Sequence, residues 1–231
     1  MIKVDNLSFS FPEKELYRNI SFTIEEGQHG ALIGASGIGK STLTDLLMDP
    51  DRFSFEGKVE IDPGYRIGYV SQFSQQDQTG EITVFEYIAN DFRKAQNKIA
   101  SICKEMETSL EMESLLERYQ EAFDEFEAIG GDDFENNIDK KLNLAGLSSR
   151  KNSLVSHLSG GEFKLIQVIQ VMLTNPHLII MDEPDVFLDF ENLNSLKNLI
   201  NAHKGMILVI THNRYLLDHL SLIHISEPTR L

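Results

Sequence analysis

Gly34-Ala35-Ser36-Gly37-Ile38-Gly39-Lys40-Ser41-Thr42 fits the pattern Gly-x-x-x-x-Gly-Lys-Ser/Thr, which is typical of a phosphate-binding loop. Residues 31–33, Ala-Leu-Ile, indicate the end of a buried strand, and residues 41–48 indicate a helix. A strand, a glycine turn and a helix N-terminus together present backbone N–H groups and a positive dipole end to an anion. This stretch therefore predicts a phosphate site in an α/β protein.

The residue types of this loop have separate predicted tasks. Glycines at 34, 37 and 39 let the backbone wrap a phosphate without Cβ clashes. Lys40 can reach the terminal phosphates of a nucleotide, and Ser41 offers a hydroxyl to Mg²⁺. The alternative is a glycine-rich surface turn, which the motifs further along the chain disfavour.

Composition limits the class of protein. The chain has 231 residues, of which 41% are hydrophobic, enough for one core or for two subdomains that share a core. It has no apolar run of the ~18 residues that a membrane span needs, no secretory signal and a single cysteine, Cys103. These features predict a cytoplasmic protein without direct membrane insertion. The net charge of −15 argues against a generally basic nucleic-acid-binding surface, and a local RNA contact stays open.

The pattern of apolar residues changes twice along the chain. Residues 1–70 alternate short apolar runs with turns, which is typical of strands with one buried face. Residues 83–144 predict two or three amphipathic helices broken at Gly130-Gly131. Residues 178–181 and 206–210 are continuous apolar runs with a helical pattern between them, which suits parallel strands buried on both faces.

The first of these runs ends in Asp182 and Glu183. Open α/β sheets bind ligands at the carboxyl ends of their strands, so both carboxylates are expected beside the phosphate loop. We predict that Asp182 helps to hold Mg²⁺, directly or through water, and that Glu183 polarises an attacking water. Two acids at a strand end are common by themselves, and the phosphate loop favours the functional interpretation.

Residues 158–162, Leu-Ser-Gly-Gly-Glu, precede an apolar helical pattern. Ser159 can cap this helix and Glu162 can complete a capping box, so the motif can be simply a well-formed helix N-terminus. Alternatively, Ser159, Gly160 and Gly161 form a second anion-binding corner at the free helix end. Both interpretations stay open.

The order and spacing of these motifs resemble the ATP-binding cassette (ABC) ATPases over about residues 1–220. The resemblance implies an α/β fold of the P-loop NTPase class and the ABC cassette type. Such a fold has a mixed sheet core, an N-terminal antiparallel β subdomain and an inserted helical subdomain, here at about residues 83–165. It also implies ATP and Mg²⁺ as ligands and ATP hydrolysis as the activity.

Further roles come from the same resemblance. It implies that Gln72 senses Mg²⁺ and the attacking water, that His212 contacts the γ-phosphate and that Phe11 stacks on adenine. Asp189 belongs to a loop that the family places across a cassette interface. The predicted catalytic residues are Glu183, His212 and Gln72; the predicted ATP-binding residues are Phe11, Gly34, Ala35, Ser36, Gly37, Ile38, Gly39, Lys40, Ser41, Thr42, Ser159, Gly160, Gly161 and Asp189; the predicted Mg²⁺ site is Ser41, Gln72 and Asp182.

A narrower resemblance to the ABC-F branch rests on residues 211–217, Thr-His-Asn-Arg-Tyr-Leu-Leu, and on residues 119–147. That branch has two cassettes in one chain and no transmembrane domains, and it includes translation factors and ribosome-protecting antibiotic-resistance proteins. The chain departs from the branch at residues 185–187, which are Asp-Val-Phe where Thr-Asn-His is usual. Leu165 and Gln170 also replace basic residues that are usual in the branch.

The family resemblance also implies a partner. In the family, ATP lies between two oppositely facing cassettes, so the Ser159 corner of a second cassette, in the same full-length chain or in a homodimer, completes each site. Residues 221–231 affect where the second cassette is expected, because they resemble translated sequencing-adapter DNA. We favour this non-native origin of the tail, in which the natural protein continues towards a second cassette. The alternative is a native strand at residues 222–225.

Three functions follow from these observations. The favoured one is an ABC-F-type ATPase that acts on ribosomes as a translation factor or an antibiotic-resistance protein. The second is the ATP-binding subunit of a membrane transporter, which docks on a separate membrane protein. The third is a non-catalytic, nucleotide-binding or structural fragment.

Overall fold

The computed structural model describes residues 1–12, 14–35, 37–62, 64–72, 81–108, 112–218 and 220, and the backbone of residues 221–224. The chain divides into two compact units. Unit 1 consists of Met1–Phe73, Pro176–Val186 and Ile200–Leu231, and unit 2 consists of Ser74–Asn175 and Phe187–Leu199. Each unit contains a hydrophobic cluster of its own.

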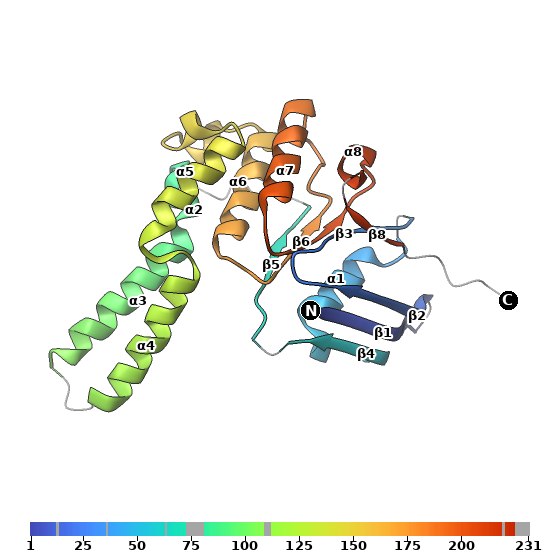
Figure 1. The fold of residues 1–231 in the computed structure, drawn as a ribbon, viewed down its shortest axis with the longest axis horizontal. Helices are drawn as coiled ribbons and strands as arrows, with labels where there is room; N and C mark the ends of the chain where they lie inside the picture. Colours follow the sequence, from blue (N-terminus) through green and yellow to red (C-terminus); the bar gives the residue numbers. More distant parts are fainter. Residues whose placement is uncertain are drawn as a thin grey trace. The chain divides into compact units, whose positions relative to one another are not determined.

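Unit 1 holds two sheets (Figure 1). The larger has the strand order β5 (Ile67–Val70), β6 (Leu178–Asp182), β7 (Met206–Ile210), β3 (His29–Ile33) and β8 (Ser221–His224). All of its neighbouring strands pair in parallel. The smaller sheet has the order β2 (Lys14–Ile24), β1 (Ile2–Phe11) and β4 (Glu56–Ile61), with antiparallel pairing. The expected mixed core therefore divides into a parallel sheet and an antiparallel sheet.

Burial explains why the central strands form. Every residue of β6 and β7 is buried, as continuous apolar sequences in a parallel sheet require. Helix α1 (Lys40–Met48) follows β3 through the phosphate loop. Its residues Leu43, Leu46 and Leu47 are fully buried in the cluster of unit 1, at the spacing of one helix face.

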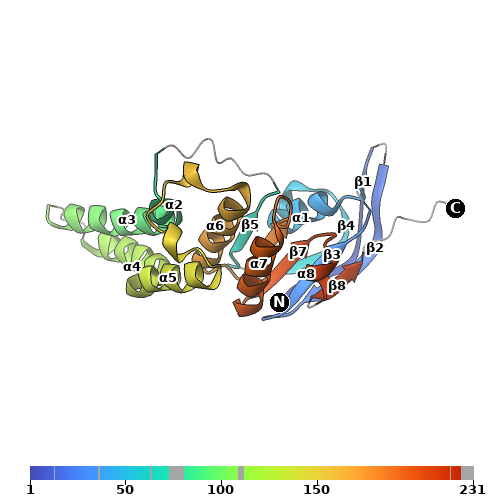
Figure 2. The same cartoon turned by 90° about the horizontal axis from the view of Figure 1, so that it is seen from above.

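Unit 2 is helical (Figures 1 and 2). Its described α-helices up to residue 173 are α2 (Val84–Ile88), α3 (Asn90–Met106), α4 (Met112–Ala128), α5 (Phe134–Leu144) and α6 (Gly160–Leu173). Short 3₁₀ helices, labelled η, lie between them: η3 (Gly131–Asp133), η4 (Ser148–Arg150) and η5 (Val155–His157). Helices α3 and α4 lie side by side around Ile102, Leu115 and Ala122. None of the described helices combines the length and the apolar character that crossing a membrane requires.

The described part of residues 83–144 forms four α-helices and one short 3₁₀ helix, where the sequence predicts two or three helices. The additional boundary lies at Ala89, which ends α2 and precedes α3. Neither glycine nor proline marks this boundary, so the sequence pattern does not reveal it. At the other end, Gly130 and Gly131 have φ angles of +115° and +49°, which is the break that the sequence predicts after α4.

Several elements complete the chain. They are η1 (Pro50–Arg52), α7 (Phe190–Ala202), which contributes residues to both units, and α8 (Arg214–Leu217). The predicted helical subdomain at about residues 83–165 falls within unit 2, which also includes Phe187–Leu199. Strand β8 pairs in parallel with β3, as the native-strand alternative for the tail requires. Residues 225–231 lie outside the described residues, and the origin of the tail stays a prediction.

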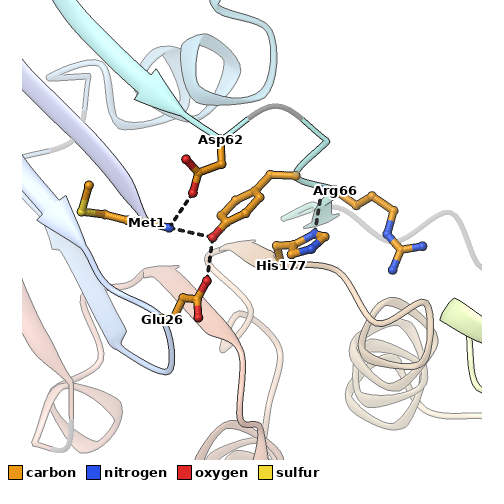
Figure 3. A network of polar contacts seen from close by, with 6 residues as sticks. Met1, Glu26, Asp62, Arg66 and His177 are labelled. Atoms are coloured by element: carbon orange, nitrogen blue, oxygen red, sulfur yellow. Dashed lines mark hydrogen bonds and ion pairs between the residues drawn. The ribbon is translucent and has the colours of Figure 1, made fainter.

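A polar network lies beside the N-terminal end of β1 in unit 1 (Figure 3). The hydroxyl of Tyr65 accepts a hydrogen bond from the Met1 amino group at 2.7 Å and donates one to Glu26 Oε1 at 2.8 Å. The Tyr65 ring stacks on His177 with 4.5 Å between centroids. Nδ1 of His177 accepts a hydrogen bond from the Arg66 N–H at 3.0 Å. The network therefore ties β1 to the segments that precede β3, β5 and β6.

The buried core of unit 1 and its exposed polar network predict different losses of stability on substitution. Leu46→Ala removes a fully buried side chain, so we expect the free energy of unfolding to fall by about 2–5 kcal/mol. Tyr65→Phe removes only an exposed hydroxyl and its bonds, so we expect a much smaller loss. Urea unfolding of both variants measures this difference, and equal losses would contradict it.

Candidate active site

The phosphate loop connects β3 to α1 in unit 1. Gly39, which precedes α1, has a φ of +101°, and Gly37 has a φ of +76°, a region that favours glycine. Lys40 is only 8% exposed, and its Nζ donates hydrogen bonds to the carbonyl oxygens of Gly34 at 2.9 Å and Ala35 at 3.0 Å. The loop thus curves around its own lysine, where the sequence predicts the terminal phosphates.

The remaining predicted loop residues occupy different environments. Ile38 is buried in the hydrophobic cluster of unit 1, so its side chain anchors the phosphate loop to the core. Ser41 and Thr42 lie in the first turn of α1, and Ser41 is exposed. Ser36 lies outside the described residues.

Tyr17 of β2 holds the end of the phosphate loop. Its side chain is fully buried, and its hydroxyl donates a hydrogen bond to the carbonyl oxygen of Gly39. A Cβ atom at Gly39 would lie 2.7 Å from Tyr17 Oη and 2.9 Å from Leu16 Cδ1, so both space and φ require glycine there. Burial raises the pKa of Tyr17 well above its usual range, and the hydroxyl therefore stays a proton donor. Sequence reasoning missed Tyr17, because an aromatic residue on a strand is typical of any core.

Asp182, the last residue of β6, lies beside the start of α1. Its Oδ2 accepts hydrogen bonds from Ser41 Oγ and from Tyr69 Oη, each at 3.3 Å. Burial, and then the charge of Asp182, raise the pKa of Tyr69 to about 12. A hydroxyl and a carboxylate that converge in this way are the oxygen ligands that Mg²⁺ prefers. The donor set of Ser41 and Asp182 therefore fits the predicted Mg²⁺ site.

Glu183 follows in the turn after β6. Its Oε2 accepts a hydrogen bond from Gln72 Nε2 at 2.7 Å, and its N–H donates to the carbonyl oxygen of Ile210 at 2.9 Å. Glu183 has a φ of +44°, a left-handed conformation that is uncommon outside glycine and that needs support from surrounding bonds. The structure thus brings Gln72 to Glu183.

Strand polarity explains why these residues gather. The phosphate loop follows β3, Gln72 follows β5, Asp182 ends β6 and His212 follows β7. Because these strands are parallel neighbours, their carboxyl ends share one edge of the sheet. His212 is exposed at that edge. The predicted catalytic and Mg²⁺-binding residues therefore lie along one edge of the larger sheet in unit 1.

The hairpin between β1 and β2 also reaches the phosphate loop. Phe11 ends β1, is 49% exposed and contacts the edge of Phe9, with 5.2 Å between ring centroids. Its strand partner is Lys14, whose Nζ donates a hydrogen bond to the carbonyl oxygen of Gly37 at 2.8 Å. The Phe11 ring is exposed, and its stacking on adenine stays a prediction.

In unit 2, Ser159 and Glu162 form the capping box that the sequence predicts. Ser159 Oγ accepts from the Glu162 N–H at 3.2 Å, and Glu162 Oε2 accepts from the Ser159 N–H at 2.8 Å. Arg150 Nε also donates to Glu162 Oε1 at 2.8 Å. Burial alone would raise the pKa of Glu162, but the bonds from Ser159 and Arg150 outweigh it and lower that pKa. The anion-binding role of Ser159 stays a prediction.

The two glycines after Ser159 differ in their surroundings. A Cβ atom at Gly161 would lie 2.7 Å from Asn192 Nδ2, so a side chain there would displace the Asn192 amide of α7. At Gly160, no described atom other than its chain neighbours and the backbone of its own helix lies within 4 Å of such a Cβ, so packing among the described residues gives no reason for glycine. Asp189 Oδ1 accepts from the Asn192 N–H at 2.8 Å at the start of α7. Asp189 thus has a capping task, and its predicted interface role is untested.

The ABC transporter family model matches residues 17–186 of the chain. The matched range contains the phosphate loop, the Ser159 corner and the two carboxylates at the end of β6. The chain therefore belongs to this family and is an ABC-type ATPase domain. The domain family hydrolyses ATP.

The curated relatives that match the chain include proteins named for translation or the ribosome and a protein named for metal transport. It is 26% identical to the energy-dependent translational throttle protein EttA of Haemophilus influenzae, over 91% of this chain and 38% of the relative. It is 24% identical to the ribosome protection protein VmlR of Bacillus subtilis, over 94% of this chain and 32% of the relative. A "Probable metal transport system ATP-binding protein" of Thermotoga maritima is 27% identical, over 87% of this chain and 68% of the relative. The chain thus spans about a third of the length of EttA and of VmlR.

Solved structures confirm the fold. The ADP conformation of an ATP-binding cassette of an ABC transporter superposes with a TM-score of 0.66 at 20% identity, over 97% of this chain and 86% of the other. An inward-facing, putative metal-chelate type ABC transporter gives a TM-score of 0.64 at 21% identity, over 96% and 78% of the two chains. The described architecture is that of an ABC cassette within the P-loop NTPase class.

The contact between Tyr17 and Gly39 predicts a nucleotide-binding effect. Tyr17→Phe removes the hydroxyl that holds the phosphate loop, so we expect the Kd for ATP to rise about tenfold, the equivalent of one lost hydrogen bond. Titration with a fluorescent ATP analogue measures this. Tyr65→Phe, which removes a hydroxyl elsewhere in unit 1, is the control. Equal Kd values for Tyr17→Phe and the control would contradict the holding role.

The lowered pKa of Glu162 predicts a pH-dependent stability. The folded state favours the ionised carboxyl, so its contribution is complete above the unfolded pKa of about 4.3 and is lost as the pH falls through the lower folded value. Glu162→Gln keeps an acceptor for the capping box but removes the charge. We expect lower urea midpoints for this variant at pH 7 and converging midpoints towards pH 3. A constant difference would contradict the assignment.

Proposed function

We propose that this chain is a cassette of a cytoplasmic ABC-F-type ATPase that acts on the ribosome, as a translation factor or an antibiotic-resistance protein. The observation that carries the proposal is the similarity to EttA and VmlR over 91% and 94% of the chain. The names of both relatives refer to translation or to the ribosome. The sequence of residues 211–217 also resembles the ABC-F branch.

In this proposal, ATP is bound by the phosphate loop and hydrolysed at the carboxyl edge of the parallel sheet. Lys40 and the first N–H groups of α1 bind the phosphates, where both the charge and the helix dipole favour an anion. Ser41 and Asp182 hold Mg²⁺, which supplies positive charge to the phosphate oxygens when it is bound. Phe11 supports the adenine.

The same edge supplies the groups for water attack. Glu183 accepts a proton from the attacking water and polarises it. Gln72, at 2.7 Å from Glu183 Oε2, orients that carboxylate and senses whether nucleotide is bound. His212 follows β7 and contacts the γ-phosphate. These assignments require that the water approach from the side of Glu183.

A second cassette completes the site in this proposal. It supplies its own Ser159 and Gly161, and its Asp189 lies across the interface. The open space at Gly160, where no described atom crowds the position, leaves room for a ligand to approach the helix end. ATP then favours the closed pair and hydrolysis favours the open pair, which makes the pair a two-state element.

The alternative is an ATP-binding subunit of a membrane transporter. The observation that favours it is the Thermotoga maritima relative, of which the chain covers 68%. In that case the cassette docks on a separate membrane protein. A neighbouring gene that encodes several apolar segments of ~20 residues each would support this alternative.

Blocking hydrolysis predicts a trapped ribosome complex. Glu183→Gln keeps the shape of the side chain but removes the carboxylate, so ATP should bind without being turned over. We expect the gene product with this change to co-sediment with ribosomes when ATP is added. Adding Lys40→Ala to the same protein should abolish the effect, because the phosphates are then not held.

Two results of this experiment would have different consequences. Turnover that is unchanged by Glu183→Gln would remove Glu183 from its proposed role. Lost turnover with no ATP-dependent ribosome association would contradict the ribosomal function and favour the transporter subunit.

A further inference from the structure

The turn after β6 and the loop after β7 are joined by a partly buried hydrogen bond in unit 1. Thr211 is fully buried, and its Oγ1 donates to Asp185 Oδ1 at 2.6 Å. This length lies in the range of about 2.5–2.7 Å that is typical of a hydroxyl bound to a carboxylate, which is stronger than a neutral pair. The bond connects residues that are 26 positions apart.

The same hydroxyl also determines the backbone around His212. Thr211 Oγ1 accepts a hydrogen bond from the Asn213 N–H at 2.9 Å, so the bond spans His212 in the manner of a Ser/Thr turn. The side chain of Asn213 then accepts from the Tyr215 N–H at 3.0 Å and caps α8. The backbone on both sides of His212 is therefore held through Thr211.

At the other end of the bond, Asp185 lies two residues after Glu183. The turn between them is closed by a bond from the Val186 N–H to the Glu183 carbonyl oxygen at 3.2 Å. Glu183 has the left-handed φ of +44°, which persists only where surrounding contacts hold it. One such contact is its N–H bond to Ile210, and the Asp185 carboxylate adds a second attachment to the loop that follows β7.

We propose that Asp185 is a positioning residue for ATP hydrolysis. Its carboxylate holds Thr211 and thereby keeps the Glu183 carboxylate and the His212 ring in one fixed arrangement. The proposal rests on the proposed roles of Glu183 and His212. Asp185 acts through Thr211, so its loss affects the rate of the chemical step rather than the binding of ATP.

Three substitutions test the bond itself. Asp185→Ala removes the acceptor, Thr211→Val removes the donor, and Asp185→Asn keeps an oxygen in the accepting position. We expect kcat to fall about 10- to 100-fold in the first two variants, the usual size for misplaced catalytic groups, while KM for ATP changes less than about twofold. Asp185→Asn should restore kcat to within about threefold of the unchanged protein.

A double-mutant cycle and a surface control sharpen this test. Because Asp185 and Thr211 act through one bond, the double variant should lose no more activity than either single variant. Asp51→Ala, an exposed acidic residue of η1, controls for the loss of one negative charge in unit 1. A kcat of Asp185→Ala equal to that control, or an equal loss in Asp185→Asn, would overturn the proposal.

Amide hydrogen exchange gives a readout that does not depend on hydrolysis. In the 231-residue chain, we expect the amides of Glu183 and Asn213 to exchange at least about tenfold faster in Asp185→Ala and at an unchanged rate in Asp185→Asn. Unchanged exchange in Asp185→Ala would overturn the proposal. If the unchanged gene product, paired with its second cassette, hydrolyses no ATP, the proposed function fails, while the exchange result still decides whether Asp185 holds both loops.

Discussion

The parallel pairing of β6 between β5 and β7 is the constraint on which the site in unit 1 depends. Val70, at the end of β5, is opposite Met181, and Asp182 is opposite Ile210, at the end of β7. Ile210 is in turn opposite Leu32, close to the start of the phosphate loop. The strands therefore end level with one another. A shift of one residue in any of these pairs would move Gln72, Asp182 or His212 by a full strand rise, about 3.3 Å.

The polar groups of the site satisfy one another before any ligand is considered. Lys40 bonds to carbonyl oxygens of its own loop, Ser41 to Asp182 and Gln72 to Glu183. Such groups are costly to bury without partners. A nucleotide therefore has to replace bonds within the protein with bonds to phosphate. Because one bond replaces another, the net free energy gained from each phosphate contact is limited. The conformation of the phosphate loop therefore depends on whether nucleotide is bound.

The sequence predicts most of what is local in this molecule and little of what joins distant segments. The phosphate loop, the capping box at Ser159 and the two acids at the end of β6 follow from spacing alone. The bond from Thr211 to Asp185 joins residues 26 positions apart that the pairing of β6 with β7 brings together. The bond from Tyr17 to Gly39 joins residues 22 positions apart, from β2 of the smaller sheet to the loop that follows β3 of the larger sheet. The helix boundary at Ala89 was missed for a different reason, because neither glycine nor proline marks it.

Calorimetric titration of the 231-residue chain with ATP, with and without Mg²⁺, tests the central claim most directly. The claim is that the edge formed by the phosphate loop and the end of β6 is a Mg²⁺-dependent ATP site. We predict one ATP per chain, weaker binding when Mg²⁺ is removed or Asp182 is changed to Asn, and no measurable binding after Lys40→Ala. Binding of ATP that survives Lys40→Ala unchanged, or no binding to the unchanged chain, would contradict this account.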